Sequence, residues 1–150
     1  MDRSDAIALR PCEENDENVE LAQRSFAAFN RTVAEGADDY YDLLDAQVEW
    51  IPITALLDGR SYRGPEAVRR WVGDLKRDWE LYEIRWKEVR DLGDGRVLVF
   101  GVWHTRGRRG GVQLSFEQAA WLIDLRCGKL TRSETFTDRS KALEAAGLRE

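Results

Sequence analysis

The sequence is poor in the residues on which many metal and redox sites depend. Among its 150 residues are only two Cys, one His, one Met and three Pro. Cys12 and Cys127 stand far apart with no CxxC partner, so a zinc site of Cys and His ligands is not expected. We expect neither a metal nor a cofactor. Two free thiols, in a chain whose start shows no secretory signal, favour the cytoplasm.

Long apolar segments are also missing. The longest, Val97–Trp103, has seven residues even when Gly101 is counted, whereas a membrane-spanning helix needs about 20. We therefore expect no membrane partner. Phosphate-binding loops, dinucleotide fingerprints and nucleophile elbows are absent as well.

Charge is distributed unevenly along the chain. Residues 1–50 carry 13 acids and 4 bases, and residues 51–150 carry 15 acids and 19 bases. A net charge of -5 argues against nucleic-acid binding, which usually needs a clustered basic face. The one basic cluster, Arg106-Gly107-Arg108-Arg109-Gly110-Gly111, is predicted to be a solvated hairpin loop, with anion binding as the alternative.

Hydrophobic spacing predicts helices first and then a run of strands. Ala22, Phe26, Phe29 and Val33 form one helical stripe that ends at Gly36. A short helical turn is expected from Asp38, and Pro65 is expected at the first position of a further helix. The other predicted elements are a strand at Val48–Ile53, strands at Leu81–Arg90, Arg96–Thr105, Val112–Leu125 and Lys129–Thr137, and a helix at Arg139–Ala146.

The predicted order is α-α-β-α-β-β-β-β-α, which is typical of an α+β layer with helices on one face of a curved antiparallel sheet. Residues 1–16 lack any period and are predicted to be a flexible tail. Residues 17–150 are predicted to form one domain. Its size is ordinary for a single domain.

Four segments of the chain carry a family resemblance. From Asn18 to Leu148, the sequence resembles the SnoaL-like branch of the NTF2-like superfamily, on the strength of Val48-Glu49-Trp50, Tyr62-Arg63-Gly64-Pro65-Glu66-Ala67-Val68, Gly128-Lys129-Leu130 and Ala142-Leu143-Glu144-Ala145-Ala146-Gly147-Leu148. The resemblance implies a cone-shaped α+β fold wrapped around its N-terminal helices, with a pocket inside. It also implies frequent dimerisation through the outer face of the sheet. Members include polyketide cyclases, ketosteroid isomerase and limonene-epoxide hydrolase, so fold constrains function poorly.

The last strand supplies the first candidate site residues. Strict alternation places Leu130, Arg132, Glu134 and Phe136 on one face. If Leu130 and Phe136 face the core, Arg132 and Glu134 point into the pocket. Glu134 would then be an acid or base oriented by Arg132, or the two would form a structural ion pair.

The other candidates lie on neighbouring strands. His104 is the one side chain whose ordinary pKa is near neutral, which suits a general acid or base, although a partly exposed or interface histidine is the alternative. Trp103 and His104 must face opposite ways. The rings of Trp50, Tyr62 and Trp103 could line a pocket for a flat apolar ligand or fill the cone. On the long strand, the pattern leaves open whether Glu117 with Trp121, or Gln118, lines it.

Two hypotheses about function follow. The first is a small-molecule pocket protein with cofactor-independent acid–base chemistry of the isomerase, cyclase or hydrolase type, using Glu134, Arg132 and His104. No complete set of ketosteroid isomerase or limonene-epoxide hydrolase residues is found in matching positions, which weakens that hypothesis. The second is a non-catalytic ligand-binding or dimerisation module with the same fold. Apolar bulk on both faces of the long strands favours a homodimer.

Overall fold

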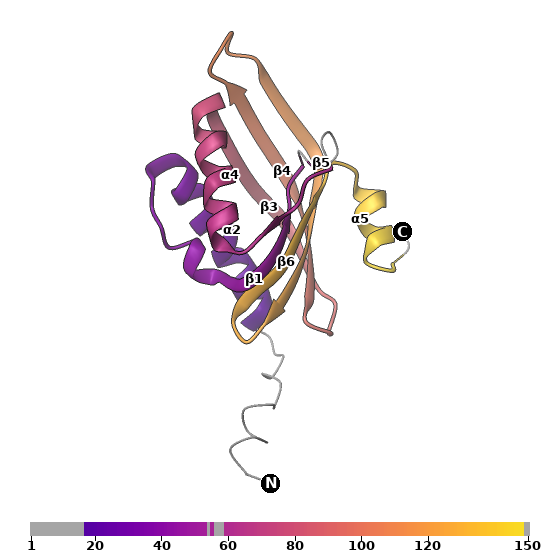
Figure 1. Ribbon diagram of the computed structural model, residues 1–150. Coiled ribbons are helices and arrows are strands. Elements are labelled where there is room, and N and C mark those ends of the chain that lie inside the picture. The colour runs from indigo at the N-terminus through magenta and orange to yellow at the C-terminus, as the bar shows by residue number, and fades with distance from the viewer. Residues whose placement is uncertain (1–16, 54, 56–58, 149–150) are drawn as a thin grey trace.

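The computed structural model describes residues 17–53, 55 and 59–148, so the predicted tail at 1–16 lies outside the described residues. Helices α2 and α4 lie on one side of a curved sheet and α5 lies on the other (Figure 1). The elements are α2 (Glu17–Glu35), a 3-10 turn (Tyr41–Leu43), β1 (Leu44–Ile51), β2 (Tyr62–Arg63), α4 (Pro65–Asp78), β3 (Trp79–Asp91), β4 (Arg96–Gly107), β5 (Gln113–Arg126), β6 (Lys129–Phe136) and α5 (Arg139–Ala145).

The sheet has six strands in the order β2-β1-β6-β5-β4-β3. This confirms the predicted α+β architecture and element order, with small differences. β1 starts at Leu44, four residues earlier than predicted, and runs parallel to β6. Helical spacing places Trp79 in the helix that begins at Pro65, but in the structure Trp79 is the first residue of β3. The short strand β2 was not predicted.

Each face of the sheet carries its own apolar cluster. On the inner face, rings from α2 and α4 pack against strand residues such as Val99 and Trp121. On the outer face, α5 covers a smaller cluster, which consists of Leu98, Phe100, Ala120, Leu122, Ala142, Leu143 and Ala146. Apolar residues on both faces of the long strands suggested a second subunit. In this part of the sheet, α5 of the same chain covers the outer face instead.

Extra residues in three strands change which side chains face inward. In β6, the pairing register shifts between Leu130 and Arg132, so Thr131 is an added residue. In β5 the register shifts opposite Gly101–Trp103, and in β3 it shifts between Trp86 and Glu88. Such bulges bend a sheet, which produces the curvature of the cone.

A side-chain amide of α2 is hydrogen-bonded to the backbone of the edge strand β3. Asn30 of α2 accepts a hydrogen bond from the backbone N–H of Ile84 (3.0 Å) and donates one to the carbonyl of the same residue (2.8 Å). The amide therefore replaces a neighbouring strand at this point of β3, which is the last strand in the order. It also fixes α2 against the strand that carries Tyr82 and Ile84.

Cys127 lies in the turn between β5 and β6 and adopts a positive φ of 54°. It is disulfide-bonded, so the expectation of a free thiol at this position is wrong. The disulfide at Cys127 removes one of the two free thiols that favoured a cytoplasmic location. Within the described part of the chain, the helices are too short or too polar to cross a membrane.

Candidate functional site

A cavity lies inside the cone, between α2 and the inner face of the sheet. Its volume is about 30 Å³, and the space between its walls, counted out to the open side, is about 400 Å³. The lining is mainly aromatic and aliphatic, with several hydroxyl groups: Ser25, Phe26, Phe29, Tyr40, Trp50, Pro52, Tyr82, Ile84, Trp121, Ile123, Leu130, Ser133 and Thr135. Roughly 10–15 Å³ are needed for one water molecule, so the cavity itself is narrow.

A hydrogen bond inside the cavity wall orients one of these hydroxyls. The indole N–H of Trp50 donates to the hydroxyl oxygen of Tyr40 over 3.2 Å. Burial raises the pKa of Tyr40 above its ordinary value, and the same cause raises the pKa of Tyr82. Both hydroxyls are therefore neutral in the physiological range. Because the Tyr40 oxygen accepts from Trp50, its own O–H is available as a donor.

The remaining polar groups of the lining are also hydroxyls. Ser25 donates to the carbonyl of Ala22 over 2.7 Å, so its proton is used within α2. Ser133 and Thr135 come from β6 and lie on the inner face beside Trp50 and Trp121. Among the described lining residues there is no carboxylate, imidazole, amine or guanidinium group. The cavity can donate and accept hydrogen bonds, but these residues offer no charged partner.

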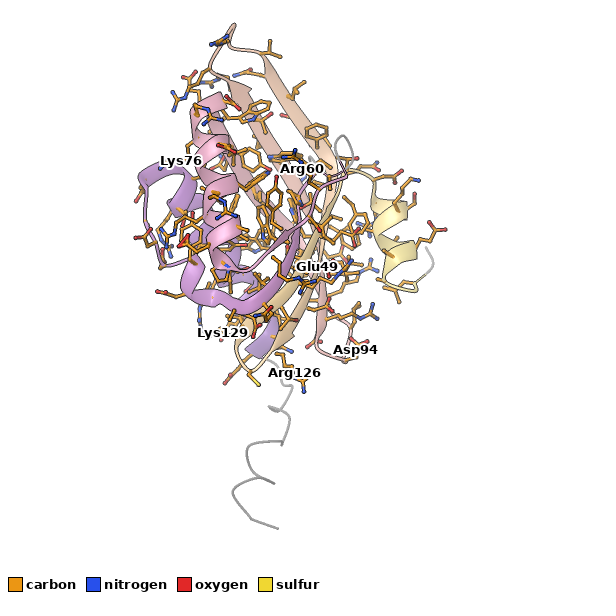
Figure 2. All side chains as sticks on the ribbon, in the orientation of Figure 1. Glu49, Arg60, Lys76, Asp94, Arg126 and Lys129 are labelled. Atoms are coloured by element: carbon orange, nitrogen blue, oxygen red, sulfur yellow. The ribbon has the colours of Figure 1, made fainter. Side chains whose placement is uncertain are left out.

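A continuous series of rings forms one wall of the cone. The ring centroids are 4.6 Å apart for Trp50 and Trp71, 6.0 Å for Trp71 and Tyr82, and 4.9 Å for Tyr82 and Trp103. Trp103 is then stacked on Phe116 at 4.8 Å. Side chains fill much of the space between the helices and the sheet (Figure 2). Each ring in this wall therefore packs against the next.

The aromatic residues predicted for the site take different positions. Trp50 and Trp121 line the cavity. Trp103 faces inward and is buried, but it lies behind Tyr82, one ring away from the lining. Tyr62, in β2, is partly buried against the inner cluster and is not among the lining residues.

Arg132 and Glu134 do not point into the cavity, so the predicted orientation is wrong. Thr131 is an extra residue, and beyond it the alternation is reversed with respect to Leu130. Glu134 therefore pairs with Leu122 on the outer face, where Arg132 lies 3.1 Å from Glu134 and 3.2 Å from Glu49. The ion pair that was the alternative is present. The catalytic roles of these two residues stay predictions.

A charged cluster surrounds this ion pair on the outer face. Asp124 lies between Arg132 and Arg96 in the strand register, and burial raises the pKa of its carboxyl group. Its Oδ1 atom is buried without a hydrogen-bond partner. Glu49 and Asp94, both labelled in Figure 2, add negative charge beside it. Desolvation outweighs the attraction of the two arginines here.

His104 and Glu117 also lie away from the cavity. His104 pairs with Glu83 and Ser115 in the register, and its Nδ1 atom lies 2.9 Å from the Ser115 hydroxyl. Its inward-facing neighbour is Trp103, as the opposite orientation of the two requires. Glu117 and Gln118 border a separate outer groove of about 220 Å³.

Two arginines of the basic loop make hydrogen bonds or ion pairs with other parts of the chain. The backbone N–H of Arg108 donates to the carbonyl of Asp78, and its Nε donates to the carbonyl of Lys76, so this residue satisfies the C-terminal end of α4. Arg106 pairs with Glu80 at 3.4 Å. These contacts support a structural loop, and they give no separate support to anion binding.

Sequence reasoning missed most of the polar lining. Strict alternation places Ser133 and Thr135 on the face opposite Leu130. The error arises because nothing in the sequence shows that Thr131 is an added residue. Tyr40 belongs to the short helical turn expected from Asp38, and no local signal in the sequence links it to Trp50. Strict alternation within the predicted strand Leu81–Arg90 puts Tyr82 and Ile84 on one face, but no pattern distinguishes the hydroxyl of Tyr82.

The sequence matches no protein-family model and no curated protein. The fold, in contrast, matches solved structures. TerC co-crystallised with polyporic acid has a TM-score of 0.68 and 21% identity, over 86% of this chain and 97% of that chain. An NTF2-like protein from Burkholderia thailandensis E264 has a TM-score of 0.67 and 23% identity, over 87% of this chain and 95% of that chain.

A third structure is that of a protein from Catenulispora acidiphila DSM 44928 in complex with trimethylamine, described as having a ketosteroid isomerase-like fold. It has a TM-score of 0.65 and 15% identity, over 83% of this chain and 92% of that chain. At these identities the likeness concerns the fold. The chain has the NTF2-like cone fold, which its resemblance to the SnoaL-like branch predicted.

Proposed function

We propose that this protein binds a small uncharged molecule in the cone cavity and acts as a ligand-binding module. The observation that supports this most is the chemistry of the lining. Its polar groups are the neutral hydroxyls of Tyr40, Tyr82, Ser133 and Thr135, besides the internally bonded Ser25. An ion placed there would lose its hydration without gaining a charged partner.

The ligand should carry a hydrogen-bond acceptor such as a carbonyl or ether oxygen. The Tyr40 hydroxyl already accepts from Trp50, so it can donate to that oxygen. The rings of Phe26, Phe29 and Trp121 would pack against the apolar part of the ligand. Two of the structural neighbours were solved with small molecules, polyporic acid and trimethylamine, which agrees with a ligand-binding role for the fold.

Charge selectivity tests the proposal. Cyclohexanone, cyclohexylammonium and cyclohexanecarboxylate share one ring and differ in charge. In titrations followed by ¹H–¹⁵N NMR, we expect only the ketone to shift resonances of residues around the cavity. Tyr40→Phe should weaken ketone binding about tenfold, and Tyr41→Phe should not. Equal binding of the three compounds, or no binding of the ketone, would contradict the proposal.

Acid–base catalysis is the second candidate, and one observation favours it. Glu134, which is paired with Arg132, borders a groove of about 140 Å³ that also includes Asp138 and Lys141. We propose this groove, and not the cone cavity, as the place where Glu134 would act as an acid or base. His104 lies on β4 opposite Glu83, whereas Glu134 lies on β6, so His104 would not act in the same groove. Unchanged turnover of an identified substrate by Glu134→Gln would remove Glu134 from the mechanism.

We also propose that the protein dimerises through the outer face of the sheet and is located in the cytoplasm. Since α5 covers the outer apolar cluster, a second subunit would have to use the charged part of that face around Glu83, Arg85 and His104. Sedimentation velocity over a range of concentrations tests the dimer, and cell fractionation tests the location.

A further inference from the structure

The first half of β5 lies at an open edge of the sheet. β6 pairs with β5 only from Ala120 onward, and β4 is the other neighbour of β5 in the strand order. Among the described residues, no strand pairs with the free edge of residues 113–119. The hairpin of β4 and β5 accordingly projects beyond α4 and beyond the end of β6 (Figure 1). A strand edge of this kind can accept a further strand.

The residues at this edge are not those of a protected edge. Open edges in native proteins are usually protected by charged residues, proline or a bulge, each of which opposes pairing with another chain. The segment Val112-Gln113-Leu114-Ser115-Phe116 contains no charge and no proline. The bulge of β5 comes after this segment, between Phe116 and Ala119. The segment alternates apolar and polar residues, which is typical of a strand with one covered face.

The apolar residues of the segment are nevertheless exposed. Val112 is 60% exposed and Leu114 is 46% exposed, and they are the large apolar residues that stand exposed within the described part of the chain. Phe116 follows them on the same face and is stacked on Trp103 of the inner cluster. The apolar inner face of the sheet therefore continues along the hairpin, where a strand laid beside β5 would cover it.

The hydrogen bonds of the hairpin show which backbone groups face the open edge. The N–H of Gly107 donates to the carbonyl of Val112 over 3.0 Å, so the backbone groups of Val112 point toward β4. This direction alternates along a strand. The backbone groups of Leu114 therefore also point toward β4, and those of Gln113 and Ser115 point toward the open edge. A new strand could pair with these two residues without breaking a hydrogen bond to β4.

We propose that this edge is an interaction surface for a second copy of the chain. The segment 112–116 of each copy would pair antiparallel with the same segment of the other, about a two-fold axis at Leu114. Leu114 then lies opposite Leu114 of the partner subunit, and Val112 lies opposite Phe116 of the partner subunit. These are the non-hydrogen-bonded positions, where side chains are closest. Gln113 exchanges backbone hydrogen bonds with Ser115 of the partner subunit.

Charge supports a second copy as the occupant. In this register Glu117 lies opposite Gly111 of the partner subunit, so Arg109 of the partner subunit comes close to the Glu117 carboxylate. Both side chains are exposed, and no two like charges lie directly opposite one another. The contact is separate from the outer-face dimer proposed above, and it does not depend on the proposed binding of a ligand.

Sedimentation velocity over a range of concentrations tests the inference. We expect the wild type to self-associate reversibly as its concentration rises. Leu114→Lys places two like charges opposite one another at the two-fold axis, and it should raise the Kd of self-association about tenfold. Because Leu114 is exposed, the change removes little from the core. Gln118→Lys adds the same charge at an exposed position beyond the paired segment, and it should leave the Kd unchanged.

A second pair of variants tests the backbone pairing itself. Ser115→Pro removes the N–H that faces the open edge, at a place where an edge strand tolerates proline. Ser115→Ala keeps this N–H and is the control, since both variants lose the contact of the hydroxyl with His104. We expect the proline variant to lose self-association and the alanine variant to keep it.

NOEs between subunits identify the residues in contact. In an equimolar mixture of ¹³C-labelled and unlabelled protein, we expect isotope-filtered NOEs from the methyl groups of Val112 to the ring of Phe116. Within one strand these residues are four positions apart, or about 13 Å, so such an NOE must come from the other subunit.

Three results would overturn the inference. The first is a monomer at every concentration. The second is a dimer that Leu114→Lys leaves intact, and intersubunit NOEs from Arg85 or His104 would then support the outer-face dimer instead. The third is a monomer whose Leu114 resonances shift when an unrelated peptide of alternating apolar residues is added, which would assign the edge to a strand of another protein.

Discussion

The indole N–H of Trp50 donates to the hydroxyl oxygen of Tyr40, which joins β1 to the segment before it across the cavity wall. Both residues are buried, with exposures of 7% and 4%. The bond satisfies a donor that would otherwise be unpaired in an apolar environment. It also determines where the Tyr40 proton can point, so it affects both stability and the proposed recognition of ligand.

Tyr40→Phe should therefore destabilise the protein by about 1–3 kcal/mol, because it leaves the Trp50 N–H buried and unpaired. Tyr41→Phe is the matched control, since the guanidinium of Arg69 lies 4.2 Å from the Tyr41 ring centroid and this contact needs no hydroxyl. Urea denaturation of the three proteins measures the difference. Equal midpoints for Tyr40→Phe and the wild type would show that the bond contributes nothing to stability.

Gly101 on β4 should tolerate no side chain. A Cβ atom there would lie 2.2 Å from the carbonyl oxygen of Arg85 and 2.8 Å from the Cα of Trp86. Because these are backbone atoms of the bent strand β3, they cannot move without disturbing the curvature of the sheet. Gly101→Ala is expected to cost about 3 kcal/mol or more, at or beyond the upper end for overpacking a core.

Gly73→Ala is the control for this substitution, and it should have the opposite sign. Gly73 is an exposed residue in the middle of α4, with nothing within 4 Å of an added Cβ. Alanine at such a position stabilises a helix by about 1 kcal/mol. Thermal melts of both variants measure the two shifts, and a neutral effect of Gly101→Ala would contradict the close approach of β3 and β4.

The fold could be predicted from the sequence, because helical spacing in 22–33 and 65–79 and alternation in 81–90 are repeated often enough to outweigh local exceptions. The faces of β5 and β6 could not. One extra residue reverses every later side chain, and Thr131 looks like any other member of an alternating strand. Glu134 and Arg132 were therefore expected inside the cone, and Ser133 and Thr135 outside it. The Tyr40–Trp50 contact depends on tertiary packing and leaves no pattern in the sequence.

Asp124 should make stability depend on pH in an unusual direction. Burial raises the pKa of this carboxyl in the folded protein, and the attraction of Arg132 and Arg96 offsets that effect only in part. The folded state then binds the proton more tightly than the unfolded state. The free energy of unfolding therefore falls as pH rises from the unfolded pKa of Asp124 to its folded pKa, and it stays lowered above the folded pKa. Asp124→Asn should be more stable than the wild type at neutral pH. The gain should vanish as pH falls below the pKa that Asp124 has in the unfolded chain.

Asp138 provides a comparison of opposite sign. Its side chain accepts hydrogen bonds from the hydroxyl and backbone N–H of Ser140 at the start of α5, which lower its pKa. Its contribution is present above the unfolded pKa and is lost as pH falls through the folded pKa. Urea denaturation at a series of pH values measures Asp124→Asn and Asp138→Asn against the wild type. A stability difference for Asp124→Asn that does not change with pH would refute the assignment.

Because α5 covers the outer apolar cluster, we expect the protein to self-associate when α5 is detached. Leu143 is 2% exposed and packs with Leu98, Phe100 and Leu122. A charge at this position cannot stay in the cluster unpaired, so Leu143→Asp should release α5 and expose the strand residues beneath it. Ala145→Asp adds the same charge at an exposed position of the same helix, and it should leave the packing intact.

Sedimentation velocity and binding of a hydrophobic dye distinguish the two variants. Leu143→Asp is expected to bind dye and to form larger species as concentration rises, since exposed apolar patches of this kind promote association. Ala145→Asp should behave as the wild type does. If Leu143→Asp sediments like the wild type and binds no dye, α5 is not what protects this face. The outer face would then have to be covered in another way, for which the proposed second subunit is the first candidate.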